Sequence, residues 1–326
     1  MTVHASIWTL DRVRLFGTTY LGTAIYHLTR LGRRADVLHA HHLYLDAVAA
    51  LLAGRIRRVP VVAKMVGAGP GGDLDRLRQT TGGSLLLKLL RTLDVVIAPS
   101  PSCRVELLAA GFPAERIRVI ANGVDTAAFR PEPTGGGAAP AGVDVGPVVV
   151  FTGRLIEAKG LLEFLEAWPL PLREVPRAHL VLVGDGTDRE ALCARARALG
   201  VAERVHLAGW VEDVVPFLWA ADAFALPSHT EGMPNGALEA MATGLPCVAT
   251  SVGAVAEVLD GGAGILVPPG HPSALAEALT GVLGHAGGAT RLGAAARARI
   301  ESRFTLEQML AKYEVLYRSL SRKGTG

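Results

Sequence analysis

The chain has 326 residues, of which 50% are hydrophobic and 19% are charged, and its formal net charge is +3. This length is about twice that of a common domain, and such an apolar chain is not typical of disorder, so two folded domains are expected. No apolar run reaches the ~18 residues that span a bilayer, and the cysteines (Cys103, Cys193, Cys247) lack metal-ligand spacing, which excludes membrane spans, zinc fingers and disulfide scaffolds.

In the first half, short β-branched runs alternate with longer segments rich in Ala, Leu and Arg, which is typical of parallel strands joined by helices. We expect strands at Asp36–Ala40, Pro60–Val66, Asp94–Ala98 and Arg118–Ile120, and helices at Leu45–Ala53, Leu85–Leu93 and Cys103–Ala110. Residues 132–147 then hold five Gly and three Pro. This composition has too little apolar area to fold and indicates an interdomain linker.

The second half repeats the same alternation. Strands are expected at Val148–Thr152, His179–Val183, Val205–Ala208, Ala223–Leu226, Pro246–Thr250 and Gly264–Val267, and helices at Gly160–Trp168, Asp188–Leu199, Val214–Trp219, Gly236–Ala242 and Ser273–Leu283. The pattern predicts an α/β protein of two doubly wound Rossmann-like domains that face a cleft, over residues 1–131 and 148–303. A last helix at Leu306–Leu320, within residues 304–326, has an apolar stripe that we expect to pack on the first domain.

Two motifs in the first half have structural explanations. The segment from Gly67 to Gly72 fits G-x-G-x-x-G, but a dinucleotide site needs an acid at the end of the next strand, whereas Asp94 begins its strand. Asp73-Leu-Asp75 resembles a metal–diphosphate motif, but it begins a helix, where acidic residues favour the helix dipole. We therefore expect neither a nicotinamide cofactor nor a metal at these positions.

The most informative segment runs from Ser228 to Pro246, where a strand leads into a helix. Pro234 favours the first helical turn. The amides of the residues that follow, Asn235, Gly236, Ala237 and Leu238, are expected to be unpaired donors that attract phosphate. Glu231 and Glu239 flank these amides, where carboxylates accept hydrogen bonds from hydroxyl groups. Phosphates in the middle of a ligand with hydroxyls at both ends indicate a nucleotide sugar.

A second candidate segment follows the first strand of this half. Gly153 allows a close backbone approach, Arg154 offers a planar fork for phosphate oxygens, and Lys159 adds a point charge. An ordinary exposed loop explains these residues singly, but two cationic or amide-rich loops in one half favour a diphosphate site. Gly184 and Val211 follow two further strands, where small residues leave room for a base and ordinary turns are the alternative.

These motifs together resemble the retaining glycosyltransferase family 4, whose fold is GT-B. The similarity rests on Gly153-Arg154 with Lys159-Gly160, on Glu231 and Glu239 with seven residues between them, on the segment Asn122–Pro131, and on Asp36–His41, a strand that ends at a histidine. It extends from about Asp36 to Leu320. The family fold implies an acceptor-side first domain and a second domain that binds the nucleotide-sugar donor.

The resemblance also implies roles for individual residues. Arg154 and Lys159 would bind the donor diphosphate and stabilise the leaving charge. Glu231 would hold hydroxyls of the donor sugar, and Glu239 would hold the ribose. His41 would face the sugar from the first domain. The alternative is that His41 is a structural residue at the strand end and that His39 or His42 is the reactive histidine. The family is thought to retain configuration by reaction on the front face of the donor, with no metal or cofactor.

The expected activity is hexosyl transfer from a nucleotide diphosphate sugar to a cell-envelope glycolipid or polysaccharide. Residues 1–146 have 17 Lys and Arg against 11 Asp and Glu, which favours an anionic or lipid-linked acceptor and peripheral contact with the inner membrane face. Nucleic acid is not expected, because the charges form short clusters with few aromatic residues. Asp11 and Arg14 lie where a signal peptide is apolar, which predicts a cytoplasmic protein.

One departure from the family leaves alternatives open. No strand, glycine-rich loop and helix is expected before Asp36, because Val3–Leu10 resembles a later strand, so about 60 residues of βα units are missing from the pattern. The alternative function is therefore an N-terminally shortened, non-catalytic relative that binds nucleotide sugar. A sugar epimerase or phosphorylase of the same fold is a third hypothesis.

Overall fold

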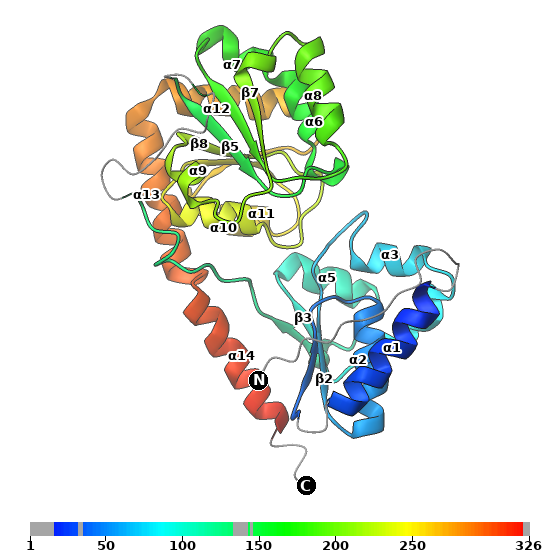
Figure 1. Ribbon diagram of the computed structural model, residues 1–326. Coiled ribbons are helices and arrows are strands. Elements are labelled where there is room, and N and C mark those ends of the chain that lie inside the picture. Colours follow the sequence, from blue (N-terminus) through cyan, green and yellow to red (C-terminus); the bar gives the residue numbers. More distant parts are fainter. Residues whose placement is uncertain (1–15, 32–34, 133–142, 144–145, 322–326) are drawn as a thin grey trace. The chain divides into compact units, whose positions relative to one another are not determined.

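The computed structural model describes residues 16–31, 35–132, 143 and 146–321. Their contacts form two units (Figure 1), unit 1 with Met1–Ala121 and Met309–Gly326 and unit 2 with Asn122–Gln308. Most of the linker expected at 132–147, and the strand expected at Val3–Leu10, lie outside the described residues.

These boundaries differ from the division at residues 131 and 303 that we expected. The segment after Asn122 belongs to unit 2 because Val124 forms a parallel bridge with Thr305. The Val124 amide donates to Phe304 O at 2.9 Å, and the Leu306 amide donates to Val124 O at 2.9 Å. The segment before the linker is thus hydrogen-bonded to the end of unit 2.

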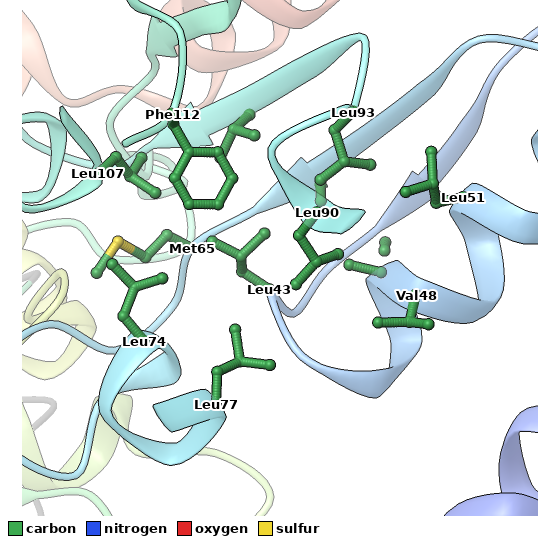
Figure 2. Packing of buried hydrophobic residues seen from close by; sticks show 14 of the residues in the cluster. Leu43, Val48, Leu51, Met65, Leu74, Leu77, Leu90, Leu93, Leu107 and Phe112 are labelled. Carbon is green, nitrogen blue, oxygen red and sulfur yellow. The ribbon is translucent and has the colours of Figure 1, made fainter. Parts of the chain in front are cut away.

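Unit 1 has one parallel sheet in the order β1-β2-β3-β4. Its elements are α1 (Phe16–Leu31), β1 (Leu38–Ala40), α2 (Leu45–Arg57), β2 (Val61–Lys64), α3 (Asp73–Gln79), α4 (Gly83–Leu90), β3 (Val95–Ala98), α5 (Pro101–Ala109), β4 (Ile117–Val119) and the greater part of α14 (Leu306–Ser321). One face of the sheet contributes Ala40, Ala63 and Ala98 to a core with α2, α3, α4 and α5. Figure 2 shows the leucines, Met65 and Phe112 that fill this core.

The opposite face of that sheet packs against α14. Tyr313, Leu316 and Leu320 form a second core cluster with side chains of β2 and β3, among them Val62 and Ile97. The predicted packing of the C-terminal helix on the first domain is therefore confirmed.

Helix α1, which precedes Asp36, was not predicted. Leu21, Ala24 and Leu28 recur at helical spacing and pack toward the core or lie buried, and the Tyr20 hydroxyl is hydrogen-bonded to Asp46 of α2. The first half of α1 contains several Gly and Thr residues. These residues interrupt the apolar pattern, and both have low helix propensity, so the sequence does not indicate a helix there.

Unit 2 has a parallel sheet in the order β10-β9-β8-β5-β6-β7. Its elements are β5 (Val148–Thr152), α6 (Leu161–Ala167), α7 (Pro169–Glu174), β6 (His179–Val183), α8 (Arg189–Ala198), β7 (Val205–Gly209), α9 (Val215–Trp219), β8 (Ala223–Leu226), α10 (Asn235–Ala242), β9 (Cys247–Thr250), α11 (Val255–Val258), β10 (Ile265–Val267), α12 (Pro272–Gly284) and α13 (Ala286–Arg303). The order reverses between β5 and β8, and doubly wound sheets bind ligands outside the carboxyl ends of strands at such a point.

Candidate functional site

Three strands of unit 2 end side by side at the carboxyl edge of the sheet. The Gly153 amide donates to Val183 O at 2.9 Å, and the Gly184 amide donates to Gly209 O at 2.8 Å. Gly153 and Gly184 have φ of +150° and +136°, where a side chain is disfavoured. Arg154 follows Gly153 at this edge, and its exposed side chain makes no hydrogen bond or ion pair with other described residues.

The third of these strands, β7, continues into Trp210 and Val211. The Trp210 side chain is 75% exposed, and Val211 is partly buried. The ends of β6 and β7 therefore lie at one edge, beside the exposed indole of Trp210, for which no role was predicted.

The loops after β5 and β8 meet through an ion pair at the point where the strand order reverses. Lys159 ends a 3-10 turn, Glu157–Lys159, and its Nζ lies 2.5 Å from Glu231 Oε1. The Ser228 hydroxyl donates to the same oxygen at 2.7 Å. The Glu231 side chain is only 7% exposed and that of Lys159 is 19% exposed, so solvent screens this pair less than a surface pair. Ser228 begins the segment singled out in the sequence, but no role in the site was predicted for it.

Helix α10 begins against the end of β5. A Cβ on Gly236 would lie 2.7 Å from Thr152 Oγ1 and 2.8 Å from Thr152 O, so only glycine allows this contact. The helix start places Asn235 at the surface, where its Oδ1 accepts a hydrogen bond of 2.6 Å from Asn122 Nδ2.

The expectation of four unpaired amides at this helix start is wrong for two of them. The Asn235 amide donates to Met233 O at 3.1 Å, and the Leu238 amide donates to Pro234 O at 3.0 Å. The turn around Pro234 supplies these carbonyl acceptors one turn earlier than we expected. Within the described chain, the amides of Gly236 and Ala237 have no partner and are the two donors available to an anion.

Glu239 lies one turn inside α10. Its carboxyl group makes no hydrogen bond with any described residue, and burial raises its pKa from 4.5 to about 7. A largely buried carboxylate without a partner is costly, which is typical of a group that receives a ligand.

His41 follows β1 in unit 1. Its ring centroid lies 4.2 Å from that of His39, and the His39 Nδ1 lies 2.6 Å from the Tyr317 hydroxyl. Burial, and then the charges of His41 and Lys64, lower the pKa of His39 to about 4, and burial and Lys64 also lower the pKa of His41. His41 is exposed at the carboxyl edge, whereas His39 points toward α14. Lys64 was not predicted to lie beside these histidines.

The remaining alternative, His42, lies beside two acids. Its Nδ1 is 3.9 Å from Asp46 Oδ2, and its Nε2 is 3.9 Å from Asp73 Oδ1. Asp73 begins α3, is nearly buried and accepts hydrogen bonds from the amides of Val66 at 2.8 Å and Gly67 at 3.2 Å. These bonds tie Asp73 to the loop before α3, and both acids of Asp73-Leu-Asp75 lie in the first turn of that helix, as the helix-start interpretation expected.

Comparison with known proteins then identifies the family. Residues 3–128 match the family model "Glycosyltransferase Family 4", and residues 146–285 match "Glycosyl transferases group 1". The glycogen synthase of Mycobacterium tuberculosis is 30% identical over 306 residues, which cover 89% of this chain and 70% of that relative. The chain belongs to glycosyltransferase family 4.

Two further relatives lie within the same class. The lipopolysaccharide core biosynthesis glycosyltransferase LpsE of Rhizobium meliloti is 32% identical over 228 residues, or 70% of this chain and 65% of LpsE. The GDP-mannose-dependent alpha-(1-6)-phosphatidylinositol monomannoside mannosyltransferase of Mycobacterium tuberculosis is 31% identical over 275 residues, or 81% of this chain and 71% of that enzyme. The expected enzyme class, a hexosyl-type glycosyltransferase, is confirmed.

Solved structures confirm the GT-B fold of this family 4 member. Anabaena Alr3699/HepE in complex with UDP-glucose has a TM-score of 0.79 at 23% identity, covering 90% of this chain and 82% of that one. Sucrose-phosphate synthase from Thermosynechococcus elongatus has a TM-score of 0.79 at 22% identity, and the match covers 95% of this chain and 80% of the synthase. No described helix of this chain combines the length and apolar character needed to cross a bilayer.

Proposed function

We propose that this family 4 glycosyltransferase moves a hexosyl group, with retention of configuration, from a nucleotide diphosphate sugar to a cell-envelope glycolipid or polysaccharide. The names of the relatives support this class of acceptor, since one is a lipopolysaccharide core enzyme and another acts on a phosphatidylinositol mannoside. The structure of Alr3699/HepE was determined with UDP-glucose, which supports a nucleotide-sugar donor.

The Lys159–Glu231 ion pair is the observation on which the donor site rests. It joins the loops after β5 and β8, where ligands of doubly wound sheets bind. In the proposal, Arg154, Lys159 and the amides of Gly236 and Ala237 hold the diphosphate. Glu231 accepts hydroxyls of the sugar, Glu239 accepts those of the ribose, and the ends of β6 and β7 leave room for the base.

The proposed reaction exchanges one bond at the anomeric carbon for another. The bond from this carbon to the β-phosphate oxygen breaks, and the nucleoside diphosphate leaves. An acceptor hydroxyl bonds to the same carbon from the same face, and its proton passes to the departing phosphate. Arg154 and Lys159 stabilise the negative charge that develops on that phosphate. His41 is proposed to hydrogen-bond to the sugar, and no metal or cofactor takes part, so transfer is expected to continue in excess EDTA.

The donor class is tested by thermal shift with UDP-, GDP- and ADP-sugars, since a ligand that binds the native state raises the melting temperature. Transfer of a radiolabelled sugar to envelope glycolipid is then measured for the wild type. A wild type that binds a nucleotide sugar but transfers none would support the non-catalytic alternative.

The site residues are tested by Glu231→Ala and Lys159→Ala. Each is expected to lower kcat/KM for transfer by about a hundredfold or more while the protein stays folded, because a donor contact is lost in the transition state. Lys88→Ala and Glu277→Ala remove exposed charges elsewhere and serve as controls. Unchanged turnover in either site variant would show that the assignment is wrong.

A further inference from the structure

The Glu231 carboxylate is held through one of its two oxygens. Oε1 receives both the Lys159 ammonium at 2.5 Å and the Ser228 hydroxyl at 2.7 Å. Oε2 has no hydrogen-bond partner among the described residues. A carboxylate in this state has one oxygen fixed by the protein and another with free lone pairs.

Ser228 is itself fixed by a neighbouring strand. Its side chain is fully buried in the loop after β8. The Thr250 hydroxyl, at the end of β9, donates to the Ser228 carbonyl oxygen at 2.5 Å. The Thr250 hydroxyl also lies 3.3 Å from Leu226 O in β8. The backbone of Ser228 is therefore tied to the ends of two adjacent strands, and its hydroxyl is held by the bond to Glu231.

The backbone of Glu231 is confined as well. Gly253 follows β9 with a φ of +50°, and a Cβ at this residue would overlap the carbonyl of Glu231. Contacts on its backbone and on Oε1 leave the carboxylate little rotational freedom. Such preorganisation lowers the entropy lost when a ligand hydroxyl binds.

We propose that Ser228 is a positioning residue, which holds the Glu231 carboxylate so that Oε2 accepts a hydroxyl of the donor sugar, and that Ser228 itself does not contact the donor. This inference rests on the proposed function, in which Glu231 binds the sugar. It assigns sugar recognition to a chain from Thr250 through Ser228 to Glu231. Lys159, whose ammonium has three donors, connects that carboxylate with the diphosphate region.

The two halves of the donor should therefore respond differently to Ser228→Ala. The hydroxyl group bonds a charged oxygen, and such bonds contribute enough for about a tenfold change in affinity. We expect the dissociation constant of UDP-glucose to rise about tenfold by calorimetry. The dissociation constant of UDP, which lacks the glucosyl group, should change less than about twofold. GDP-mannose with GDP, and ADP-glucose with ADP, are measured in parallel, and the pair that the wild type binds is compared.

A double-mutant cycle tests whether Ser228 acts through Glu231. In the Glu231→Gln background, Ser228→Ala is expected to have no further effect on nucleotide-sugar binding, because an amide NH2, which donates, replaces the oxygen that accepts the sugar hydroxyl. Thr243→Val is the matched control, since Thr243 is a buried residue of unit 2 whose hydroxyl bonds only Ala240 O at 2.8 Å. It is expected to bind both ligands of the pair as the wild type does.

Each outcome decides the proposal. A selective loss of sugar-nucleotide affinity that vanishes in the Glu231→Gln background supports it. Equal weakening of both ligands overturns it, since Ser228 would then bind the diphosphate or support the fold. Additive effects of the two substitutions also overturn it. A wild type that binds no UDP-, GDP- or ADP-sugar overturns the proposed function itself, and with it this inference.

Discussion

Glu239 is a carboxyl group whose pKa rises from 4.5 to about 7 because α10 and its neighbours bury it. The unfolded chain ionises this group near pH 4.5, whereas the folded protein ionises it near pH 7. Between these values the folded state binds the additional proton, so stability falls as pH rises. Above pH 7 the full cost of a buried, unpaired carboxylate is present, and below pH 4.5 it is absent.

Glu239→Gln is therefore expected to stabilise the protein at pH 8 and to have a smaller effect at pH 5. A shift from 4.5 to about 7 corresponds to at most ~3 kcal/mol, and partial exposure reduces this to about 2 kcal/mol. Urea unfolding of both proteins at the two pH values measures the difference. Glu277→Gln, an exposed control in α12, should show no such pH dependence. A gain that does not grow from pH 5 to pH 8 would contradict the assignment.

The same substitution separates stability from binding. If Glu239 accepts ribose hydroxyls, the variant that is more stable at pH 8 binds nucleotide sugars less tightly, because an amide is a weaker acceptor than a carboxylate. Such an exchange of stability for affinity is common where a site keeps a polar group without a protein partner.

At the scale of elements, the contact of α10 with β5 depends on Gly236. Gly236→Ala would place a methyl group 2.7 Å from Thr152 Oγ1 and 2.8 Å from Thr152 O, so the helix start must move away from the strand end. We expect nucleoside diphosphate affinity to fall at least tenfold, because the free amides of the helix start shift with it. Calorimetry measures the loss.

The control for this variant is Gly281→Ala in α12. Gly281 is exposed, and no heavy atom lies within 4 Å of a Cβ built there. Alanine is expected to stabilise that helix by about 0.5–1 kcal/mol and to leave nucleotide affinity unchanged. Equal affinities for Gly236→Ala and the wild type would show that the helix start does not bind the diphosphate.

Helix α14 provides a test of packing in unit 1. Leu316 is 7% exposed in the cluster against β2 and β3, while its neighbour Val315 is 71% exposed. Leu316→Ala is expected to destabilise the protein by about 2–4 kcal/mol, and Val315→Ala by less than about 0.5 kcal/mol. Denaturant unfolding of the two variants measures this. Similar losses in both would contradict the observed orientation of the helix.

Sequence patterns predicted elements best where burial is complete. Val148–Thr152 has the bounds expected, because four buried apolar residues and a buried threonine between Pro147 and Gly153 permit few other structures. Helix α13 was missed, since Gly287, Gly288 and small residues weaken its apolar period. Turn geometry around Pro234 could not be predicted, although it decides which amides are free.

Within the site, the sequence indicated the charged residues and missed those that hold them. The spacing of Glu231 and Glu239 is a local pattern. Ser228 and Thr250 matter because β8 and β9 are neighbours, which only the sheet order reveals. Lys64 is likewise beside His41 because β1 pairs with β2.

At the scale of the whole molecule, charge is divided unevenly along the chain. Residues 1–146 have 17 Lys and Arg against 11 Asp and Glu. Within unit 1, a hollow of about 570 Å³ is lined by Arg55, Arg58, Arg116 and Arg118, with Asp94 and Glu115 as its acids. Ile56, between two of these arginines, is 66% exposed. Cationic and apolar side chains together favour contact with an anionic lipid surface.

We therefore expect the protein to bind vesicles of phosphatidylglycerol and not vesicles of phosphatidylcholine. Binding should weaken between 0.05 and 0.3 M salt, because the Debye length shortens over this range. Arg55→Gln with Arg58→Gln is expected to weaken binding by tenfold or more, at about 1 kcal/mol for each arginine near the surface. The control changes two exposed arginines of unit 2, Arg173 and Arg197, to Gln. Co-sedimentation measures binding of the wild type and both double variants to each kind of vesicle at low and high salt. Equal binding by the two double variants would contradict a membrane surface at the end of α2.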